Sequence, residues 1–266
     1  MSKTFQVWKS NEWRKYFPEE NIKKNGVLTL TEQGMYSITK PMEAKQIIGH
    51  LMKYVASSAT VLDGTAGCGG DTISLASQFN HVISVELNKS NCECLKTNIA
   101  AYNFSEDKIE IVCPDSLIDI VEDSEYKYDV LFLDPPWGGR KYKEKKALSL
   151  YLCKSLKINL EEDDKCFEKI IAQKIANNVP DKLFVMKVPI NFNLAEFKNE
   201  ISGRMVHRYP IFKYYYEIEK GRLKVMKTND IAFLLIVVEG VKKGGSWYKK
   251  YVKYKTKYLQ IKQSSG

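Results

Sequence analysis

One tetrapeptide in the chain, Asp134-Pro135-Pro136-Trp137, has residue types that suit chemistry on an amino group. Its two prolines lack a backbone N–H and hold the chain in an extended bend, which leaves carbonyl oxygens facing outward. The carboxylate of Asp134 and the carbonyl of Pro135 can both accept hydrogen bonds from an NH₂ group and turn its lone pair toward an electrophile. Trp137 offers a flat face on which a nucleobase can stack. The motif therefore predicts alkylation of an exocyclic amino nitrogen, with Asp134, Pro135 and Trp137 as catalytic residues.

Taken alone, the same tetrapeptide also fits a proline-rich turn beside a core tryptophan, so the prediction depends on the elements around it. A second motif, residues 63–70 (DGTAGCGG), predicts a ligand-binding loop because glycine permits tight turns and close backbone approach. A dinucleotide-binding loop would follow the pattern G-x-G-x-x-G. Here the loop opens with Asp63, an acid that suits the cationic amino group of S-adenosylmethionine.

Two further acidic positions support a cofactor site. Glu86 ends the strand after the loop, where an acid can accept hydrogen bonds from both ribose hydroxyls of a nucleoside. Asp115 and Ser116 follow the third strand and are placed to receive an adenine amino group. Because the carboxyl ends of consecutive parallel strands share one edge of a sheet, these residues are expected to lie together with Asp63. S-adenosylmethionine is the predicted cofactor.

The elements that position these residues form an alternating pattern. The predicted strands are 60–62, 81–87, 108–113, 128–133, 183–188, 211–218 and 231–238, and helices are predicted at 71–79 and 90–102. Nearly continuous apolar strands are typical of a parallel sheet that helices cover on both faces. The last two strands are expected to form a hairpin joined by Glu219-Lys220-Gly221 and a polar stretch. The pattern predicts a doubly wound α/β domain with a seven-stranded, mostly parallel sheet and helices on both faces.

Three parts of the chain are predicted. Residues 1–58 form a small N-terminal helical extension, with aromatic residues at Trp8, Trp13 and 16–17 and an amphipathic helix at 41–54. Residues 59–243 form the methyltransferase domain, and residues 244–266 form a basic, aromatic C-terminal tail. The tail either runs along an RNA backbone or forms a solvated terminal helix, and the second interpretation is slightly favoured.

Charge and composition limit the classes of partner. The net charge of +9, from 41 basic and 32 acidic residues, favours an anionic partner such as nucleic acid, although many lysine-rich proteins are simply soluble. No run of about 18 apolar residues is present and the N-terminus lacks the apolar core of a signal peptide. We therefore expect no membrane association and an intracellular location, nuclear or cytoplasmic, and cytoplasmic if the protein is viral.

The six cysteines do not form a pair of CxxC motifs, so no metal site is expected. Free thiols in a reducing compartment are the simpler interpretation. No cysteine stands beside the Pro-Pro motif as a nucleophile, which disfavours methylation of a base carbon.

The tetrapeptide matches the [Asp/Asn/Ser]-Pro-Pro-aromatic signature of amino-group methyltransferases. Its extension into Gly138-Gly139, together with residues 63–70, resembles the trimethylguanosine synthase family, as does Gly34-Met35-Tyr36-Ser37-Ile38-Thr39 before a helix. The resemblance covers roughly residues 8–240. It implies the α/β, Rossmann-like fold of a class I S-adenosylmethionine-dependent methyltransferase. It also implies methyl transfer from S-adenosylmethionine to the 2-amino nitrogen of the 7-methylguanosine cap of RNA.

The resemblance, with the loop motif, also implies roles for individual residues. The cofactor-binding residues would be Thr39, Asp63, Gly64, Thr65, Gly67, Glu86, Asp115, Ser116 and Asp134. The substrate-binding residues would be Trp13, Trp137, Asn191 and Lys187. Trp137 would stack on the cationic 7-methylguanine ring, where cation–π attraction adds to stacking. A monomer that binds capped RNA is expected.

The chain departs from the family pattern at two positions. Ile190 stands where the family often has arginine, so cap phosphate contacts are expected from Lys9, Arg14, Lys15 or Lys187. Asp134 stands where the family commonly has serine, which bears on whether one or two methyl groups are transferred. Two alternatives stay open: an amino-group methyltransferase acting on guanine or adenine in tRNA, rRNA or DNA, and a noncatalytic cap-binding module.

Overall fold

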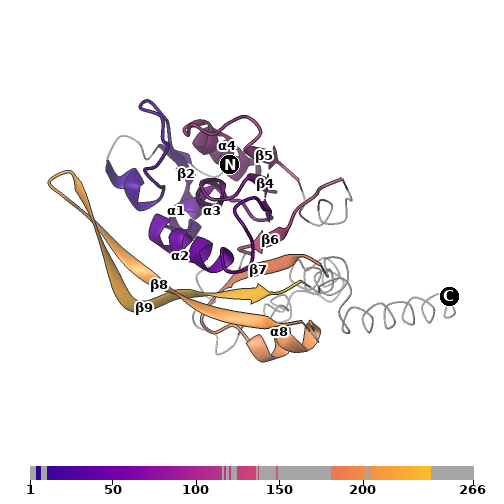
Figure 1. Ribbon diagram of the computed structural model, residues 1–266. Helices are drawn as coiled ribbons and strands as arrows, with labels where there is room; N and C mark the ends of the chain where they lie inside the picture. Colours follow the sequence, from indigo (N-terminus) through magenta and orange to yellow (C-terminus); the bar gives the residue numbers. More distant parts are fainter. Residues whose placement is uncertain are drawn as a thin grey trace, which may run out of the picture.

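The computed structural model describes residues 4–6, 11–115, 117, 120, 125–135, 137, 148, 181–201 and 204–240. At its centre is a seven-stranded sheet with the order β5-β4-β3-β6-β7-β9-β8 (Figure 1). The strands are β3 (Thr60–Asp63), β4 (His81–Val85), β5 (Ile109–Val112), β6 (Val130–Leu133), β7 (Leu183–Val188), β8 (Val206–Glu219) and β9 (Arg222–Val238). The strands from β5 to β7 are parallel, whereas β9 is antiparallel to both β7 and β8. The predicted α/β fold with a mostly parallel sheet is confirmed.

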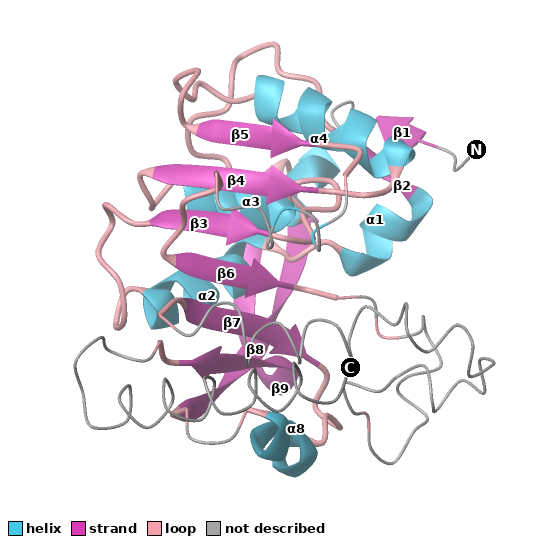
Figure 2. Ribbon diagram, turned by 90° about the vertical axis from the view of Figure 1, so that its right-hand side faces the viewer, coloured by secondary structure: helices cyan, strands magenta, loops and turns pink. Residues whose placement is uncertain are grey.

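Helices cover both faces of this sheet because alternate side chains of the central strands point to opposite sides. Among the described residues the α-helices are α1 (Glu32–Ser37), α2 (Pro41–Leu51), α3 (Gly70–Ala76), α4 (Lys89–Ala100) and α8 (Leu194–Glu200). On one face Leu62 of β3 belongs to the same buried cluster as Phe197 of α8. On the other face Val61 clusters with Ile47 of α2 and Leu75 of α3. Figure 2 shows the parallel strands side by side, with their carboxyl ends along one edge.

The N-terminal part contains a small sheet as well as the predicted helices. Strand β1 (Thr4–Gln6) pairs antiparallel with β2 (Thr29–Thr31), and a short 3-10 helix, η1 (Asn11–Lys15), lies between them in sequence. The helix predicted at 41–54 forms over a shorter span, as α2. The extension is therefore mixed rather than purely helical. The division of the chain into three parts stays a prediction.

The C-terminal hairpin is longer than predicted. Lys220 and Gly221 both have positive φ, 49° and 74°, which is the two-residue turn that matches the twist of a β-hairpin. This turn pairs Glu219 with Arg222 and continues the ladder through residues expected to form a polar connection. In Figure 1 the hairpin extends well past α2. Cross-strand pairing satisfies the backbone there without a buried side-chain pattern, so hydrophobic periodicity does not reveal it.

Helix α2 is hydrogen-bonded to the central part of β8. The side chain of Gln46 exchanges two hydrogen bonds with the backbone of Phe212, at 2.8 and 3.1 Å. The hydroxyl of Tyr216 donates to the buried carboxylate of Glu43 at 3.0 Å and accepts from the backbone N–H of Met42. These contacts hold the segment before β3, including Thr39, close to the central sheet.

The expectation that all cysteines are free thiols is wrong for one pair. Cys92 of α4 and Cys113, just after β5, form a disulfide, whereas Cys68 and Cys94 are free and buried. The pairing arises because α4 folds back across the ends of β4 and β5, which sequence spacing alone does not indicate. Cys153 and Cys166 lie outside the described residues.

Candidate active site

The glycine-rich loop begins at Asp63, the last residue of β3. Its side chain is fully buried, and Oδ2 accepts a hydrogen bond from the hydroxyl of Thr72 in α3 at 2.6 Å. Oδ1 accepts from the backbone N–H of Thr65 at 3.4 Å. Burial, and then the nearby charge of Asp71, raise the pKa of Asp63 to about 7, although the Thr72 hydrogen bond opposes this. Asp63 is therefore a buried acid poised to ionise near neutral pH.

The loop needs glycine at several positions. Gly67 and Gly69 have φ values of +55° and +93°, the left-handed region that side chains disfavour. Gly64 lies so close to the core that a Cβ there would come within 2.5 Å of Leu117. The backbone N–H of Gly67 donates to Oε2 of Glu86 at 2.7 Å. The loop thus turns tightly from β3 into α3 and reaches the end of β4.

The predicted acids do gather at one edge of the sheet. Glu86 follows β4, and its Oε1 accepts from the backbone N–H of Asn88 at 2.7 Å. The backbone N–H of Asp115 donates to the carbonyl of Glu86 at 3.1 Å. Since β3, β4 and β5 are neighbours in the sheet, Asp63, Glu86 and Asp115 succeed one another along its edge. Ser116 lies outside the described residues.

The Asp-Pro-Pro-Trp motif begins where β6 ends, directly beside the loop. The backbone N–H of Asp134 donates to the hydroxyl of Thr65 at 2.6 Å, which joins the motif to the loop. Pro135 is buried, and Pro136 lies outside the described residues. The indole of Trp137 is partly buried and packs edge-on against Phe192, with ring centroids 5.7 Å apart. Phe192 and its neighbour Asn191 follow β7, the strand next to β6 in the sheet. The predicted substrate residues Trp137 and Asn191 therefore follow adjacent strands.

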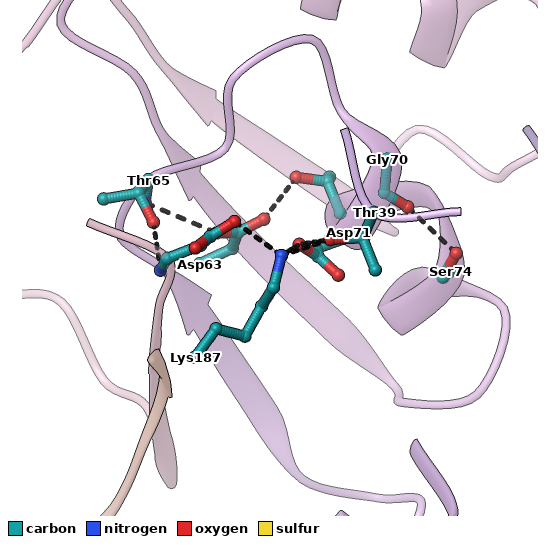
Figure 3. Close-up of polar contacts among 9 residues, drawn as sticks. Thr39, Asp63, Thr65, Gly70, Asp71, Ser74 and Lys187 are labelled. Atoms are coloured by element: carbon teal, nitrogen blue, oxygen red, sulfur yellow. Dashed lines mark hydrogen bonds and ion pairs between the residues drawn. The ribbon is translucent and has the colours of Figure 1, made fainter. Parts of the chain in front are cut away.

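Lys187 differs from its predicted role as a phosphate contact. The residue lies within β7 and is only 4% exposed. Its ammonium donates to Oδ2 of Asp134 at 2.5 Å. It also donates to Oδ2 of Asp71 at 3.3 Å and to the hydroxyl of Thr39 (Figure 3). Since these groups surround the ammonium, its position argues against contact with a phosphate on the surface. Nearby negative charges raise the pKa of Lys187 despite its burial.

Trp13 also differs from its predicted role. It is 6% exposed and belongs to a hydrophobic cluster with Phe17, Leu28 and Tyr102. The packing that orders the N-terminal part thus occupies this indole, and the position does not support stacking on a cap base. Thr39 lies within reach of the loop, since its hydroxyl donates to Oδ2 of Asp71 at 2.6 Å.

Asp71 and Thr72 are residues of this site that the sequence analysis did not single out. Both stand in the first turn of α3, where an acid and a hydroxyl are ordinary helix-start residues. Their position directly after the glycine-rich loop is the feature of the sequence that could have identified them as site residues. In the part of the chain that the structure covers, no group of three His, Cys, Asp or Glu side chains is arranged to hold a metal ion. No helix there is long and apolar enough to cross a membrane.

A comparison with protein families resolves which kind of enzyme uses such a site. Residues 58–229, well over half of the chain, match the family model described as RNA cap guanine-N2 methyltransferase. The chain belongs to this family. The matched segment begins just before β3 and extends into β9. It therefore includes both the glycine-rich loop and the Asp-Pro-Pro-Trp motif.

The curated relatives of the chain include two trimethylguanosine synthases. The chain is 28% identical over 124 residues to the trimethylguanosine synthase of Schizosaccharomyces pombe, covering 46% of this chain and 51% of the relative. It is 28% identical over 142 residues to the Saccharomyces cerevisiae trimethylguanosine synthase, covering 53% and 43%. An uncharacterized protein of Acanthamoeba polyphaga mimivirus is 27% identical over 153 residues, covering 58% and 55%. The chain spans about half the length of the curated relatives it matches.

Solved structures similar to this family member include other methyltransferases. The tRNA methyltransferase TrmI from Aquifex aeolicus is 13% identical, with a TM-score of 0.47 over 78% of this chain and 71% of that one. A precorrin-6y methyltransferase from Geobacter metallireducens is 13% identical, with a TM-score of 0.49 over 76% of this chain and 92% of that one.

Proposed function

We propose that the protein transfers a methyl group from S-adenosylmethionine to the exocyclic 2-amino nitrogen of the 7-methylguanosine cap of RNA. The observation that carries this proposal is the position of Asp134. Its backbone N–H is bonded to Thr65 of the glycine-rich loop, and its carboxylate is bonded to the buried ammonium of Lys187. The motif that suits an amino group and the loop that suits the cofactor therefore share one edge of the sheet. Family membership supports the same assignment.

The residues at the loop fit S-adenosylmethionine. Three acids, Asp63, Asp71 and Asp134, face one described cation, Lys187, so the cluster favours a further positive charge. The cofactor carries such charges on its amino group and its sulfonium. Glu86 and Asp115, farther along the edge, are the acceptors proposed for ribose and adenine. When bound, S-adenosylmethionine supplies an electrophilic methyl group.

On the substrate side, the protein acts by holding one nitrogen in place. The carboxylate of Asp134 and the carbonyl of Pro135 accept hydrogen bonds from the two N–H groups of the amino group. Its lone pair is thereby directed toward the methyl group of the cofactor. Trp137 stacks on the base, and a cationic 7-methylguanine is held more firmly than neutral guanine because cation–π attraction is added. Asn191, which follows the adjacent strand β7, is a further proposed substrate-binding residue. A location inside the cell follows from the proposed substrate.

The preference for a cationic base is directly testable. With labelled S-adenosylmethionine, we expect a 7-methylguanosine cap dinucleotide to be methylated about 5–30-fold more efficiently, in kcat/KM, than the unmethylated guanosine dinucleotide. The magnitude follows from about 1–2 kcal/mol of cation–π attraction at a desolvated ring. Comparable turnover of both dinucleotides would contradict the proposed substrate, and efficient methylation of uncapped tRNA would instead favour another amino-group methyltransferase.

The ionisation of Asp63 gives cofactor binding a defined pH dependence. With a pKa of about 7, Asp63 is about one tenth ionised at pH 6 and about nine tenths ionised at pH 8. If the carboxylate receives the cofactor's amino group, affinity for S-adenosylhomocysteine rises up to about tenfold over this range. Calorimetric titrations at several pH values measure this rise. Asp63→Asn should flatten the profile and weaken binding at pH 8.

The same substitution should have the opposite effect on the stability of the ligand-free protein. Folding raises the pKa of Asp63, so its contribution to stability is full below its unfolded pKa and is lost as pH rises toward 7. Asp63→Asn is therefore expected to raise the melting temperature at pH 8 while weakening cofactor binding. A variant that loses both stability and binding would indicate a purely structural aspartate.

A further inference from the structure

The strand β7 places a lysine in the interior of the domain, where lysine is rarely found unless it is paired. Lys187 pairs through its backbone with Leu235 of β9, and its side chain lies over the ring of Phe233, 4.8 Å from the ring centroid. A buried ammonium costs several kcal/mol in desolvation unless its hydrogen bonds are satisfied. The contacts that offset this cost therefore indicate what the residue does.

Lysine has three N–H donors, and Lys187 directs them to three different segments of the chain. The acceptors are Thr39 before α2, Asp71 in the first turn of α3 and Asp134 after β6. Side-chain exposure is 5% for Lys187, 12% for Asp71 and 27% for Asp134. The network thus leads from the buried ammonium to Asp134, which is the most exposed of these three side chains.

From this geometry we propose that Lys187 is a positioning residue, which binds Oδ2 of Asp134 so that the other carboxylate oxygen faces the amino group of the substrate. The inference rests on the proposed function for the identity of that amino group. It differs from the phosphate contact expected from the sequence, because it requires a buried ammonium and no contact with the cap phosphates.

The pairing also keeps Asp134 able to accept two hydrogen bonds. Burial raises the pKa of the Asp134 carboxyl, the nearby charge of Lys187 lowers it, and the charge of Asp71 raises it. Asp63, itself buried and close to Asp71, is the other acid of this cluster. Without Lys187, the carboxyl would carry a proton at higher pH and would present a donor where the amino group needs an acceptor. The ammonium thus opposes the effect of burial and of the second acid.

Two substitutions should move the titration of Asp134 in opposite directions. Lys187→Met keeps the length of the side chain and removes its charge, and we expect the midpoint for Asp134 to rise by about 1–3 pH units. Asp71→Asn keeps an oxygen for Thr39 and removes the competing charge, so the midpoint should fall. A general loss of structure cannot produce shifts of opposite sign.

Carbon-13 carboxyl resonances measure this titration without any enzymatic assay, with the Asp134 signal assigned as the one missing in Asp134→Asn. The matched control is Lys182→Met, which changes a partly exposed lysine just before β7 and should leave the Asp134 midpoint unchanged. Should Lys187→Met fail to fold, Asp71→Asn alone decides the point. An unshifted or raised midpoint in Asp71→Asn, or an unshifted midpoint in folded Lys187→Met, overturns the proposal.

Kinetics then separate the positioning role from the proposed function itself. In Lys187→Met the acidic limb of the kcat profile should move to higher pH by as much as the Asp134 midpoint moves, with little change in KM for the cap dinucleotide. If wild-type protein does not methylate the cap at all, the proposed function fails while the titration result stands. If wild-type protein is active but Lys187→Met keeps the wild-type kcat profile, the positioning role fails.

Discussion

Asp134→Asn is expected to lower kcat for cap methylation about 100-fold or more, equivalent to about 2.7 kcal/mol, although the side chain keeps its shape. An amide has one acceptor oxygen and one NH₂ group. The ammonium of Lys187 already binds this side chain at 2.5 Å and will take the oxygen of the asparagine. The NH₂ group then faces the substrate amino group, which places two donors against each other. Single-turnover rates with saturating cofactor measure the loss.

The effect should be confined to the chemical step. In the proposed complex, stacking on Trp137 contributes most of the binding of the base, so KM for the cap dinucleotide should stay within a few-fold of the wild-type value. The melting temperature serves as the control for folding, since Lys187 keeps Asp71 and Thr39 as partners. A variant with near wild-type kcat would show that the side chain of Asp134 does not orient the reacting nitrogen.

Trp137→Ala is expected to weaken cap binding by about 1–3 kcal/mol, or about 5–150-fold, while cofactor affinity is retained. The proposed role of the indole is to stack on the base, whereas the loop that starts at Asp63 is held by its own hydrogen bonds to Thr65 and Thr72. Fluorescence or calorimetric titration with a 7-methylguanosine nucleotide, beside one with S-adenosylhomocysteine, measures the two affinities separately.

The packing of Trp137 on Phe192 calls for a matched variant. Trp137→Phe keeps an aromatic face and most of the edge contact, so cap binding should fall much less than in Trp137→Ala. Equal losses of cap and cofactor affinity in Trp137→Ala would indicate that the indole mainly supports the core. Unchanged cap affinity would exclude it from the substrate site.

The strand pattern of the sequence was enough to predict the fold and the edge of the sheet on which the candidate site residues lie. Runs such as Val130–Leu133 are short and apolar, as in strands buried on both faces, and their order along the chain places Asp63, Glu86, Asp115 and Asp134 at carboxyl ends. Because parallel strands bring those ends together, local patterns are sufficient to assemble these acids.

The positions of Lys187 and Trp13 could not be predicted from local sequence patterns. Most lysines are exposed, so a lysine near a predicted cap site is naturally interpreted as a phosphate contact. Its burial depends on acceptors from residues 39, 71 and 134, which only the folded chain brings together. Trp13 is likewise determined by packing, since its 6% exposure results from a cluster with residues 28 and 102.

Pairing between distant parts of the chain also explains the other differences between the predicted and the observed structure. The polar first half of β9 forms a strand because β8 provides a partner with matching register, not because of its own side chains. The disulfide between Cys92 and Cys113 joins a helix to the end of a strand that is distant in sequence. In each case the deciding interaction is non-local.

The most direct test of the account uses a substrate that lacks only the reacting nitrogen. Wild-type protein with labelled S-adenosylmethionine should methylate a 7-methylguanosine cap dinucleotide, with mass spectrometry placing the new methyl on the 2-amino group. It should transfer none to a 7-methylinosine cap dinucleotide, in which hydrogen replaces that amino group. Transfer of label to the inosine compound, or a new methyl elsewhere on the guanosine compound, would contradict the claim that the site at Asp134 acts on the exocyclic 2-amino nitrogen.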